Sequence, residues 1–200
     1  IGAGEVVVIS APTSCGKSQL ALNICARNIS RNNLPCGIVS LEMPQKQIIK
    51  RMTACISGVQ IAQIQDQVVR DEDMDKVNDA LEQIEGAPLY TIHSVKNIND
   101  LTAQIRAMHR RHKVELVVID YLQLIPFNAA NSKAEAVSDM SHKIKQLALD
   151  LNIAIVLLSQ VNREGSRSHE GLELYHLRDS GDIENDADVI VLMWPFNTDL

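Results

Sequence analysis

The fold is inferred first from the segment Ala11-Pro12-Thr13-Ser14-Cys15-Gly16-Lys17-Ser18. It follows an apolar, strand-sized run at residues 6–10 and precedes residues 18–29, whose apolar positions repeat with helical period. It fits the phosphate-loop pattern G-x-x-x-x-G-K-S/T, except that Ala11 stands in place of the first glycine. Backbone N–H groups at a helix N-terminus bind phosphate, because the helix dipole favours an anion there. The sequence therefore predicts a buried strand, a phosphate-binding loop and a helix, in that order.

The residues of this loop have distinct expected roles. Gly16 permits close approach of the backbone to phosphate, Lys17 reaches the β- and γ-phosphates, and Ser18 supplies a hydroxyl to Mg²⁺. We therefore expect ATP and Mg²⁺ as cofactors. The residues predicted to bind the nucleotide are Ala11, Pro12, Thr13, Ser14, Cys15, Gly16, Lys17, Ser18 and Gln19.

Strand-sized apolar runs alternate with helical segments along the rest of the chain. Further strands are predicted at residues 37–41, 89–92, 114–119, 153–158 and 189–193. Helices are predicted at 45–57, over most of 60–86 with a break near 68–70, from Asn97 or Asn99 to about 112, and at 133–151. This alternation favours an α/β fold, a mostly parallel, twisted sheet with helices on both faces.

Length and composition indicate one globular domain. The chain has 200 residues, of which 46% are hydrophobic and 22% charged, and this excludes a disordered chain, a collagen and a coiled-coil rod. The formal net charge of −6 argues against a generally basic nucleic-acid coat protein, but it is compatible with a local basic channel. No apolar run is long enough to span a membrane.

The cysteines and the chain ends give two further expectations. The four cysteines include no C-x-x-C pair, so we expect free thiols in a reducing compartment. The chain begins with Ile1 rather than Met and stops at Leu200, soon after a predicted strand. We therefore expect a domain of a longer protein.

Two carboxylates end predicted strands, where a parallel sheet forms its ligand crevice. Asp120 follows L-V-V-I, and we favour a Mg²⁺ ligand over a turn aspartate, because a carboxylate at the end of a buried strand is costly without a cation. Glu42 lies in S-L-E-M and is a candidate base for an attacking water. The alternative for Glu42 is a charged residue at the start of a helix.

Four polar side chains after strands have open interpretations. The Gln160 amide suits a hydrogen bond to a γ-phosphate, but spacing alone does not separate this role from that of a solvated loop glutamine. Arg163, Arg167 and Arg178 lie on polar loops, where they either meet nucleic-acid phosphates or are simply solvated. No aromatic pair interleaves them, which favours backbone contact over base stacking.

Taken together, these residues resemble the replicative DNA helicases of the DnaB type, in their RecA-like ATPase domain. The matching segments occur in the family's order over nearly the whole chain. They are A-P-T-S-C-G-K-S at 11–18, S-L-E-M at 40–43, D-Y-L-Q-L at 120–124, L-S-Q-V-N-R at 158–163 and L-R-D-S-G-D-I-E-N-D-A-D at 177–188. The phosphate loop alone is common to many NTPases, whereas the third and fifth segments are specific. Ala11 is common in this family, and Asp179 stands where the family more often has Glu.

The resemblance implies a RecA-like P-loop NTPase core and a ring hexamer that moves along single-stranded DNA using ATP. It assigns phosphate binding to Lys17, the catalytic base to Glu42 and γ-phosphate sensing to Gln160. It assigns the metal to Ser18 and Asp120. It places Arg178, Asp179 and Gly181 in a loop that faces the central channel, where the phosphates of the DNA strand are held. Arg163 and Arg167 are candidate DNA contacts from their positions on polar loops, and the two interpretations given above stay open for them.

Residues 1–200 match the ATPase domain alone. We expect the family's N-terminal collar domain to lie outside these residues, and the β-hairpin with the arginine finger to lie beyond Leu200. We therefore expect this fragment to hydrolyse ATP poorly by itself. The resemblance also implies primase and a helicase loader as partners of the full-length protein, no membrane, and the cytoplasm of a bacterium or a phage-infected cell.

Three other functions are weighed against a DNA motor. A strand-exchange recombinase or regulatory ATPase shares the sheet and the loop, but D-Y-L-Q-L and L-R-D-S-G disfavour it. A P-loop nucleotide kinase would use an arginine-rich lid, and residues 60–112 contain no Gly-flanked Arg cluster. A non-catalytic ring or loader-binding module is disfavoured because the residues expected to bind and hydrolyse ATP are all present.

Overall fold

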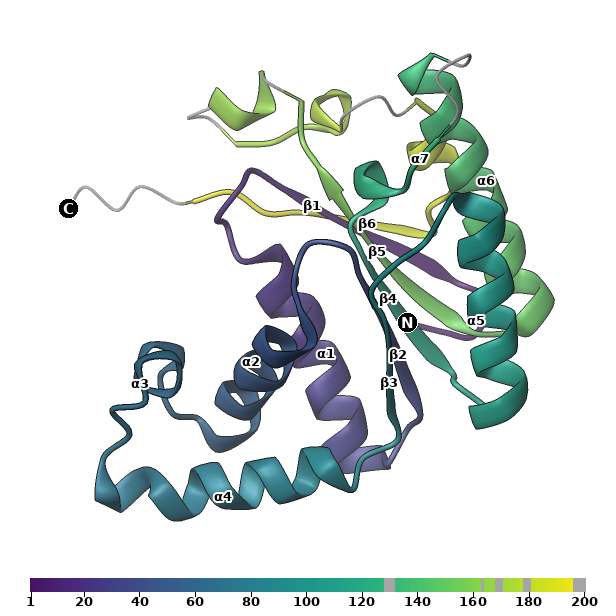
Figure 1. Cartoon of the computed structure of the whole chain (residues 1–200). Coiled ribbons are helices and arrows are strands. Elements are labelled where there is room, and N and C mark those ends of the chain that lie inside the picture. The colour runs from purple at the N-terminus through teal and green to yellow at the C-terminus, as the bar shows by residue number, and fades with distance from the viewer. Residues whose placement is uncertain (128–131, 163, 168–170, 178–180, 196–200) are drawn as a thin grey trace.

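A parallel sheet forms the centre of the computed structural model (Figure 1). The structure describes residues 1–127, 132–162, 164–167, 171–177 and 181–195, and within them six strands pair in parallel in the order β3-β2-β4-β5-β1-β6. The strands are β1 Val6–Ala11, β2 Cys36–Ser40, β3 Leu89–Ile92, β4 Leu116–Asp120, β5 Ala154–Gln160 and β6 Val189–Leu192. All carboxyl ends therefore meet at one edge of the sheet.

Helices cover both faces of this sheet, as Figure 1 shows. One face packs against α1 and α2, with the end of α4 beside them, and the other packs against α5, α6 and α7. The helices are α1 Lys17–Asn32, α2 Gln45–Ser57, α3 Ile61–Asp66, α4 Asp71–Glu85, α5 Ile98–His112, α6 Lys133–Leu151 and α7 Gly181–Asp186. Three 3₁₀ helices in the described residues are η1 Leu122–Leu124, η2 Gly165–Arg167 and η3 Leu174–His176. The predicted α/β class with a parallel sheet is confirmed.

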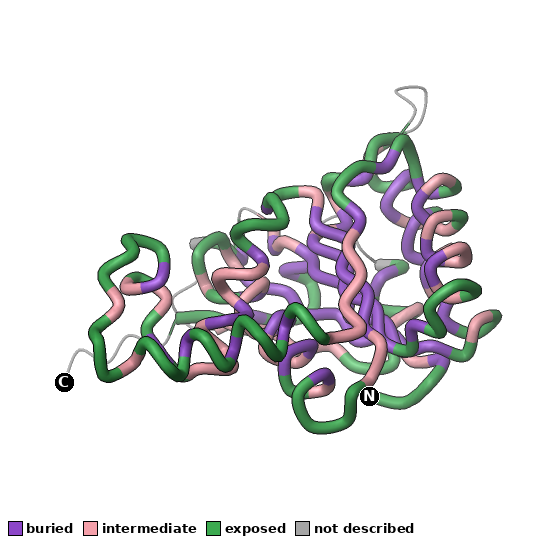
Figure 2. The backbone as a smooth tube through the Cα atoms, turned by 60° about the horizontal axis from the view of Figure 1, so that its bottom comes forward, coloured by how far each residue is buried: buried purple, intermediate pink, exposed green. Residues whose placement is uncertain are grey.

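Burial explains why the central strands read as unbroken apolar runs. Every residue of β1, β2 and β4 is buried, because helices cover both sides of them. Figure 2 shows that buried residues gather at the centre of the chain. The edge strands β3 and β6 are mostly half-buried. The core is aliphatic, as the low aromatic content of 3% requires.

Local signals fix the ends of several helices. Asn97 caps α5, since its side chain accepts a hydrogen bond from Asp100 N at 3.0 Å, and this decides between the two candidate caps. Ser132 and Glu135 form a capping box at the start of α6. Gly58 ends α2 at φ 73°, a left-handed conformation that favours glycine.

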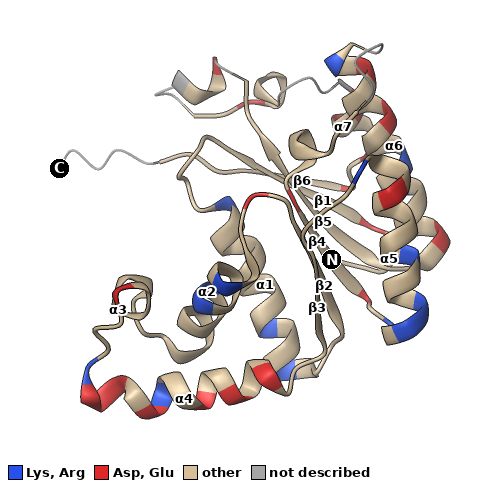
Figure 3. Ribbon diagram, viewed as in Figure 1, with Lys and Arg blue, Asp and Glu red and all other residues tan. Residues whose placement is uncertain are grey.

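The charged residues lie mainly on the outer helices. Figure 3 shows acidic residues along α4 and basic residues at the C-terminal end of α5. The last turn of α5 contains His109, Arg110, Arg111 and His112, which face the negative end of the helix dipole. Among the described residues, we find no helix that combines the length and apolarity needed to cross a bilayer.

Truncation of Leu147 is expected to destabilise the fold strongly. Leu147 on α6 is fully buried, so Leu147→Ala should cost about 2–5 kcal/mol of unfolding free energy. Leu149, two residues along the same helix, is 59% exposed and provides a matched control, for which Leu149→Ala should change stability by at most about 0.5 kcal/mol. Urea unfolding of both variants measures the difference, and equal midpoints would contradict the packing described.

Candidate nucleotide-binding site

A cavity of about 540 Å³ opens at the carboxyl ends of the strands. The phosphate loop forms one wall of this cavity. Three further side chains line it from the carboxyl ends of neighbouring strands: Glu42 after β2, Asp120 in β4 and Gln160 in β5. The lining residues are Thr13, Ser14, Cys15, Gly16, Lys17, Ser18, Gln19, Glu42, Met43, Gln47, Arg51, Asp120 and Gln160. The structure thus brings together side chains that lie far apart in the sequence.

The backbone of the loop leaves the start of α1 open toward this cavity. Gly16 precedes the helix at φ 85°, a left-handed conformation that a side chain would strain. No side chain caps α1, whose first residue is Lys17. The first N–H groups of a helix lack partners within the helix, so an anion in the cavity can accept hydrogen bonds from them.

Lys17 places a buried ammonium group at the base of the loop. Its Nζ donates to the carbonyl oxygens of Ala11 at 3.1 Å and Pro12 at 3.4 Å. These two predicted loop residues therefore hold the lysine and do not line the cavity. Burial lowers the pKa of Lys17, while attraction to Asp120, and to Cys15 and Glu42, opposes that shift. A further anion in the cavity would stabilise this charge.

Asp120 is a buried carboxylate with an unused oxygen. It ends β4, is 3% exposed, and its Oδ1 has no hydrogen-bond partner. Burial raises its pKa, and a hydrogen bond with the Ser18 side chain is the largest effect that opposes the rise. A hydroxyl and a carboxylate side by side, one with a free oxygen, fit the oxygen-ligand preference of Mg²⁺. The predicted pair of Ser18 and Asp120 therefore suits a metal bound together with phosphate.

Glu42 is held at the cavity by a tight turn after β2. The Ser40 hydroxyl donates to the Met43 carbonyl at 2.9 Å and accepts from the Met43 N–H at 3.2 Å. This turn fixes the backbone on both sides of Glu42, an exposed residue that lines the cavity. Glu42 also acts on the charges of Lys17 and Asp120, so it lies within electrostatic range of both.

Gln160 lines the same cavity from the end of β5, where it is half-buried. The sequence left two interpretations open for this side chain. Its position in one cavity with Lys17 and Glu42 favours contact with a bound ligand over the role of a glutamine on a solvated loop.

Arg51 is a cavity residue that the sequence analysis missed. It lies on α2, one turn after Gln47, and both line the cavity. Its Nη1 donates to Gln19 Oε1 at 3.3 Å, and Gln19 Nε2 donates to Cys55 Sγ at 2.9 Å. Its Nε is buried without a partner. The signal was the spacing of Gln47 and Arg51, which places both on one face of α2.

The candidate DNA contacts are described in part. Arg163, Arg178 and Asp179 lie outside the described residues. Arg167 ends η2, and Gly181 is the first residue of α7.

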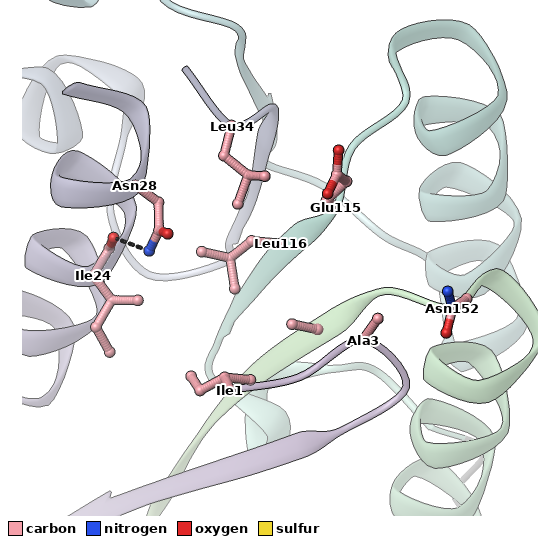
Figure 4. A pocket seen from close by; sticks show the side chains of 9 residues that line it. Ile1, Ala3, Ile24, Asn28, Leu34, Glu115, Leu116 and Asn152 are labelled. Carbon is pink, nitrogen blue, oxygen red and sulfur yellow. Dashed lines mark hydrogen bonds between the residues drawn. The ribbon is translucent and has the colours of Figure 1, made fainter. Parts of the chain in front are cut away.

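A second cavity, of about 570 Å³, lies near the amino-terminal ends of β4 and β5 (Figure 4). Ile1, Ile24, Leu34 and Leu116 supply apolar walls. Glu115 is the one charged side chain among the described residues that line it. An apolar cavity with an acidic residue does not suit a polyphosphate, so the strand-end cavity is the candidate nucleotide site.

A family model and curated sequences match this chain over nearly its full length. The model of the DnaB-like helicase C-terminal domain matches residues 1–197. A probable plasmid replicative DNA helicase of Chlamydia trachomatis serovar L2 is 34% identical over 192 residues, which are 95% of this chain and 43% of the relative. The replicative DNA helicase DnaB of Treponema pallidum is 33% identical over 192 residues, which are 94% of this chain and 43% of the relative. The chain thus spans less than half the length of these relatives.

Two solved structures share the fold at 30% sequence identity. One is described as an ATPase domain, and it aligns with a TM-score of 0.84 over 95% of this chain and 69% of that chain. The other is a DnaB-like replicative helicase, described together with its interactions with primase, and it aligns with a TM-score of 0.85 over 94% of this chain and 46% of that chain. Both alignments therefore extend over nearly the whole of this chain.

Replacement of Asp120 by Asn is expected to stabilise the chain when nucleotide and metal are absent. Because burial raises the pKa of Asp120, the folded state binds its proton more tightly than the unfolded state does, and stability falls as the pH rises above the ordinary carboxyl pKa of 3.8. The Tm of Asp120→Asn should therefore exceed that of the wild type near pH 7, by about 2–4 °C for each kcal/mol gained.

The pH dependence provides the check on this expectation. The gain should shrink toward about pH 4, where the wild-type carboxyl takes up its proton. Asp75→Asn, at an exposed position on α4, is the matched control and should leave Tm unchanged at both pH values. A lower Tm for Asp120→Asn near neutral pH would mean that attraction to Lys17 outweighs the cost of burial.

Proposed function

The chain belongs to the family of DnaB-like helicase C-terminal domains, and from this premise we propose that it is the ATP-hydrolysing motor domain of a replicative DNA helicase. The observation that carries the proposal is the convergence of Lys17, Glu42, Asp120 and Gln160 on one cavity at the strand ends. Membership of the family implies that this cavity binds a nucleotide. The nucleotide is proposed to be ATP, bound with Mg²⁺.

Phosphate binding follows from the charges of the cavity. Lys17 provides a buried positive charge, and the open start of α1 provides backbone donors. Arg51 adds a second cation, which has no ion-pair partner within the described residues. Together the two cations balance Glu42 and Asp120, so that a bound polyphosphate is not repelled by the carboxylates.

Metal binding is proposed for Ser18 and Asp120. The unpartnered Oδ1 of Asp120 supports this role, because a buried anionic oxygen needs a cation or a donor. When bound, Mg²⁺ would neutralise charge on the β- and γ-phosphates. Asp120 and Ser18 would hold this ion beside the phosphate loop.

Hydrolysis is proposed to use Glu42 and Gln160. Glu42 would accept a proton from the water that attacks the γ-phosphate, and its fixed turn keeps the carboxylate at the cavity. Gln160 would donate a hydrogen bond to the γ-phosphate and lose it on product release. Lys17 would stabilise the charge that develops on the phosphoryl oxygens.

DNA contact is proposed for the loops after the strands. Arg163, Arg167, Arg178, Asp179 and Gly181 are the proposed residues, and the contact would read the phosphate backbone rather than the bases. The proposal rests on the sequence resemblance for Arg178, Asp179 and Gly181, and on their positions in polar loops for Arg163 and Arg167. A motor that translocates along any sequence requires contact of this kind.

Assembly and partners are proposed for the full-length protein. We propose a homohexameric ring around single-stranded DNA, in which a neighbouring subunit supplies an arginine to the γ-phosphate, so that residues 1–200 alone hydrolyse ATP poorly. Primase and a helicase loader are the proposed partners, and the cytoplasm is the proposed location. The recombinase and kinase alternatives have no observation that favours them over the family match.

Glu42→Gln is expected to separate binding from hydrolysis in the full-length protein. The amide keeps the size of the side chain but cannot accept the proton, so DNA-stimulated ATP turnover should fall by about 10²–10⁴-fold while ATP affinity is retained. Glu82→Gln, at an exposed position on α4, is the matched control and should have wild-type turnover. Unchanged turnover of Glu42→Gln would mean that another group is the base.

Arg178→Ala is expected to weaken single-stranded DNA binding without a change in sequence preference. Loss of one phosphate contact should reduce the slope of log affinity against log salt by about 0.7 for each subunit engaged. Arg110→Ala, at the exposed end of α5, is the control and should leave the slope unchanged. DNA titrations at several salt concentrations measure the slope, and an unchanged slope for Arg178→Ala would remove this residue from the DNA site.

A further inference from the structure

The side chain of Gln123 completes the end of β5 beside the nucleotide cavity. Pairing between β4 and β5 ends at Ile119 and Leu157, whereas β5 continues to Gln160. After β4 the chain turns into η1, which carries Gln123. The Oε1 atom of Gln123 accepts a hydrogen bond from the backbone N–H of Gln160 at 3.3 Å. The side-chain carbonyl of Gln123 thus supplies the acceptor that a further residue of β4 would otherwise provide.

A second hydrogen bond fixes the orientation of the same amide. Gln123 Nε2 donates to Ser159 Oγ at 2.8 Å, and that hydroxyl donates to the Gln160 carbonyl at 3.4 Å. Since the Gln160 N–H needs an acceptor, Oε1 must face it and Nε2 must face Ser159. Gln123 therefore holds the backbone around Gln160 through two interactions.

Ser159 and the residues that flank Gln123 are held in place by the core. Ser159 is fully buried, and its carbonyl accepts a hydrogen bond from Ser10 Oγ of β1 at 3.2 Å. Leu122 and Ile125, on either side of Gln123, are 0% and 1% exposed, so they anchor the turn in the core. Gln123 consequently extends from a rigid base to the one cavity residue of β5, Gln160.

We propose that Gln123 is a positioning residue, which directs the Gln160 side chain toward the γ-phosphate. This inference rests on the proposed function, because it needs Gln160 to contact the nucleotide. Ala11 of β1 pairs with Gln160 on one side, and Gln123 supplies the acceptor for the Gln160 N–H on the other. A backbone N–H that loses its acceptor costs free energy, so loss of the Gln123 amide would loosen the backbone at Gln160. With a loosened backbone, the Gln160 side chain would adopt several orientations, and fewer of them would reach the γ-phosphate. Gln123 would then affect hydrolysis through Gln160 and not through a contact of its own.

The test is a double-mutant cycle on DNA-stimulated ATP hydrolysis by the full-length protein. Gln123→Met keeps the length of the side chain but removes both hydrogen bonds, and it should lower kcat about three- to tenfold with KM changed less than about twofold. Gln160→Ala should lower kcat further. In the Gln160→Ala background, Gln123→Met should cause almost no additional loss, because the group that it positions is gone.

A matched glutamine controls for general loss of packing. Gln104 on α5 is half-buried and also bonds a backbone group, donating to the Ser94 carbonyl at 3.1 Å, but it does not line the nucleotide cavity. Gln104→Met should leave kcat unchanged. If Gln123→Met does not fold, Ser159→Ala removes one half of the bridge and takes its place in the cycle, with the same expected result.

The outcomes separate this inference from the proposed function. If Gln160→Ala lowers kcat but Gln123→Met does not, or if the two losses add in full, Gln123 does not act through Gln160 and the inference is wrong. If Gln160→Ala leaves kcat unchanged, the proposed role of Gln160 fails, and the inference fails with it. A loss of kcat from Gln123→Met that disappears in the Gln160→Ala background supports it.

Discussion

A buried ammonium group at the end of β1 is the constraint on which the nucleotide site depends. Lys17 Nζ is held by two backbone carbonyls of the loop, and no carboxylate forms an ion pair with it in the described part of the chain. Burial lowers its pKa, and the nearby charges of Asp120 and Glu42 only partly offset that effect. The ammonium group of Lys17 can therefore pair with an anion in the cavity, and the open start of α1 attracts an anion as well.

The rest of the fold serves to bring partners to this charge. A parallel sheet places all of its carboxyl ends along one edge, so Glu42 after β2, Asp120 in β4 and Gln160 in β5 reach one cavity. Helices on both faces bury the central strands, which leaves Asp120 only 3% exposed. The unused oxygen of Asp120 and the unpartnered Nε of Arg51 are buried polar groups that a nucleotide with its metal would satisfy.

Much of this arrangement was predictable because its signals are local. Three elements have the bounds expected from apolar period and strand length, and they are Lys133–Leu151, Gln45–Ser57 and Leu89–Ile92. The bounds of the other predicted elements differ from the observed ones by one to three residues. For strands, pairing with a neighbour rather than apolarity decides the end, and β5 reaches Gln160 because β1 pairs with it that far. The catalytic candidates were predictable because each lies at or just after the end of a strand.

Arg51 and Gln123 were not predicted, because their roles depend on tertiary packing. Arg51 reaches the cavity because α2 packs beside α1 and Gln19 holds its guanidinium. Gln123 bridges to β5 because η1 turns back over the end of the sheet. Gln47 and Arg51 share one face of α2, and Gln123 lies within D-Y-L-Q-L, but neither feature shows which atoms the side chain contacts. The proposed DNA contacts rest on the resemblance and on the polar loops of the sequence, and three of the five residues lie outside the described part of the chain.

The most direct test of the account is calorimetric titration of Mg-ATP into the chain and into Lys17→Ala. In the proposed site Lys17 would provide a charge-assisted phosphate contact worth about 1.5–3 kcal/mol, so its loss should weaken affinity by about 10- to 150-fold. Lys46→Ala, at an exposed position on α2, should bind as the wild type does. Equal affinity of the wild type and Lys17→Ala would contradict the claim that this buried charge organises the site.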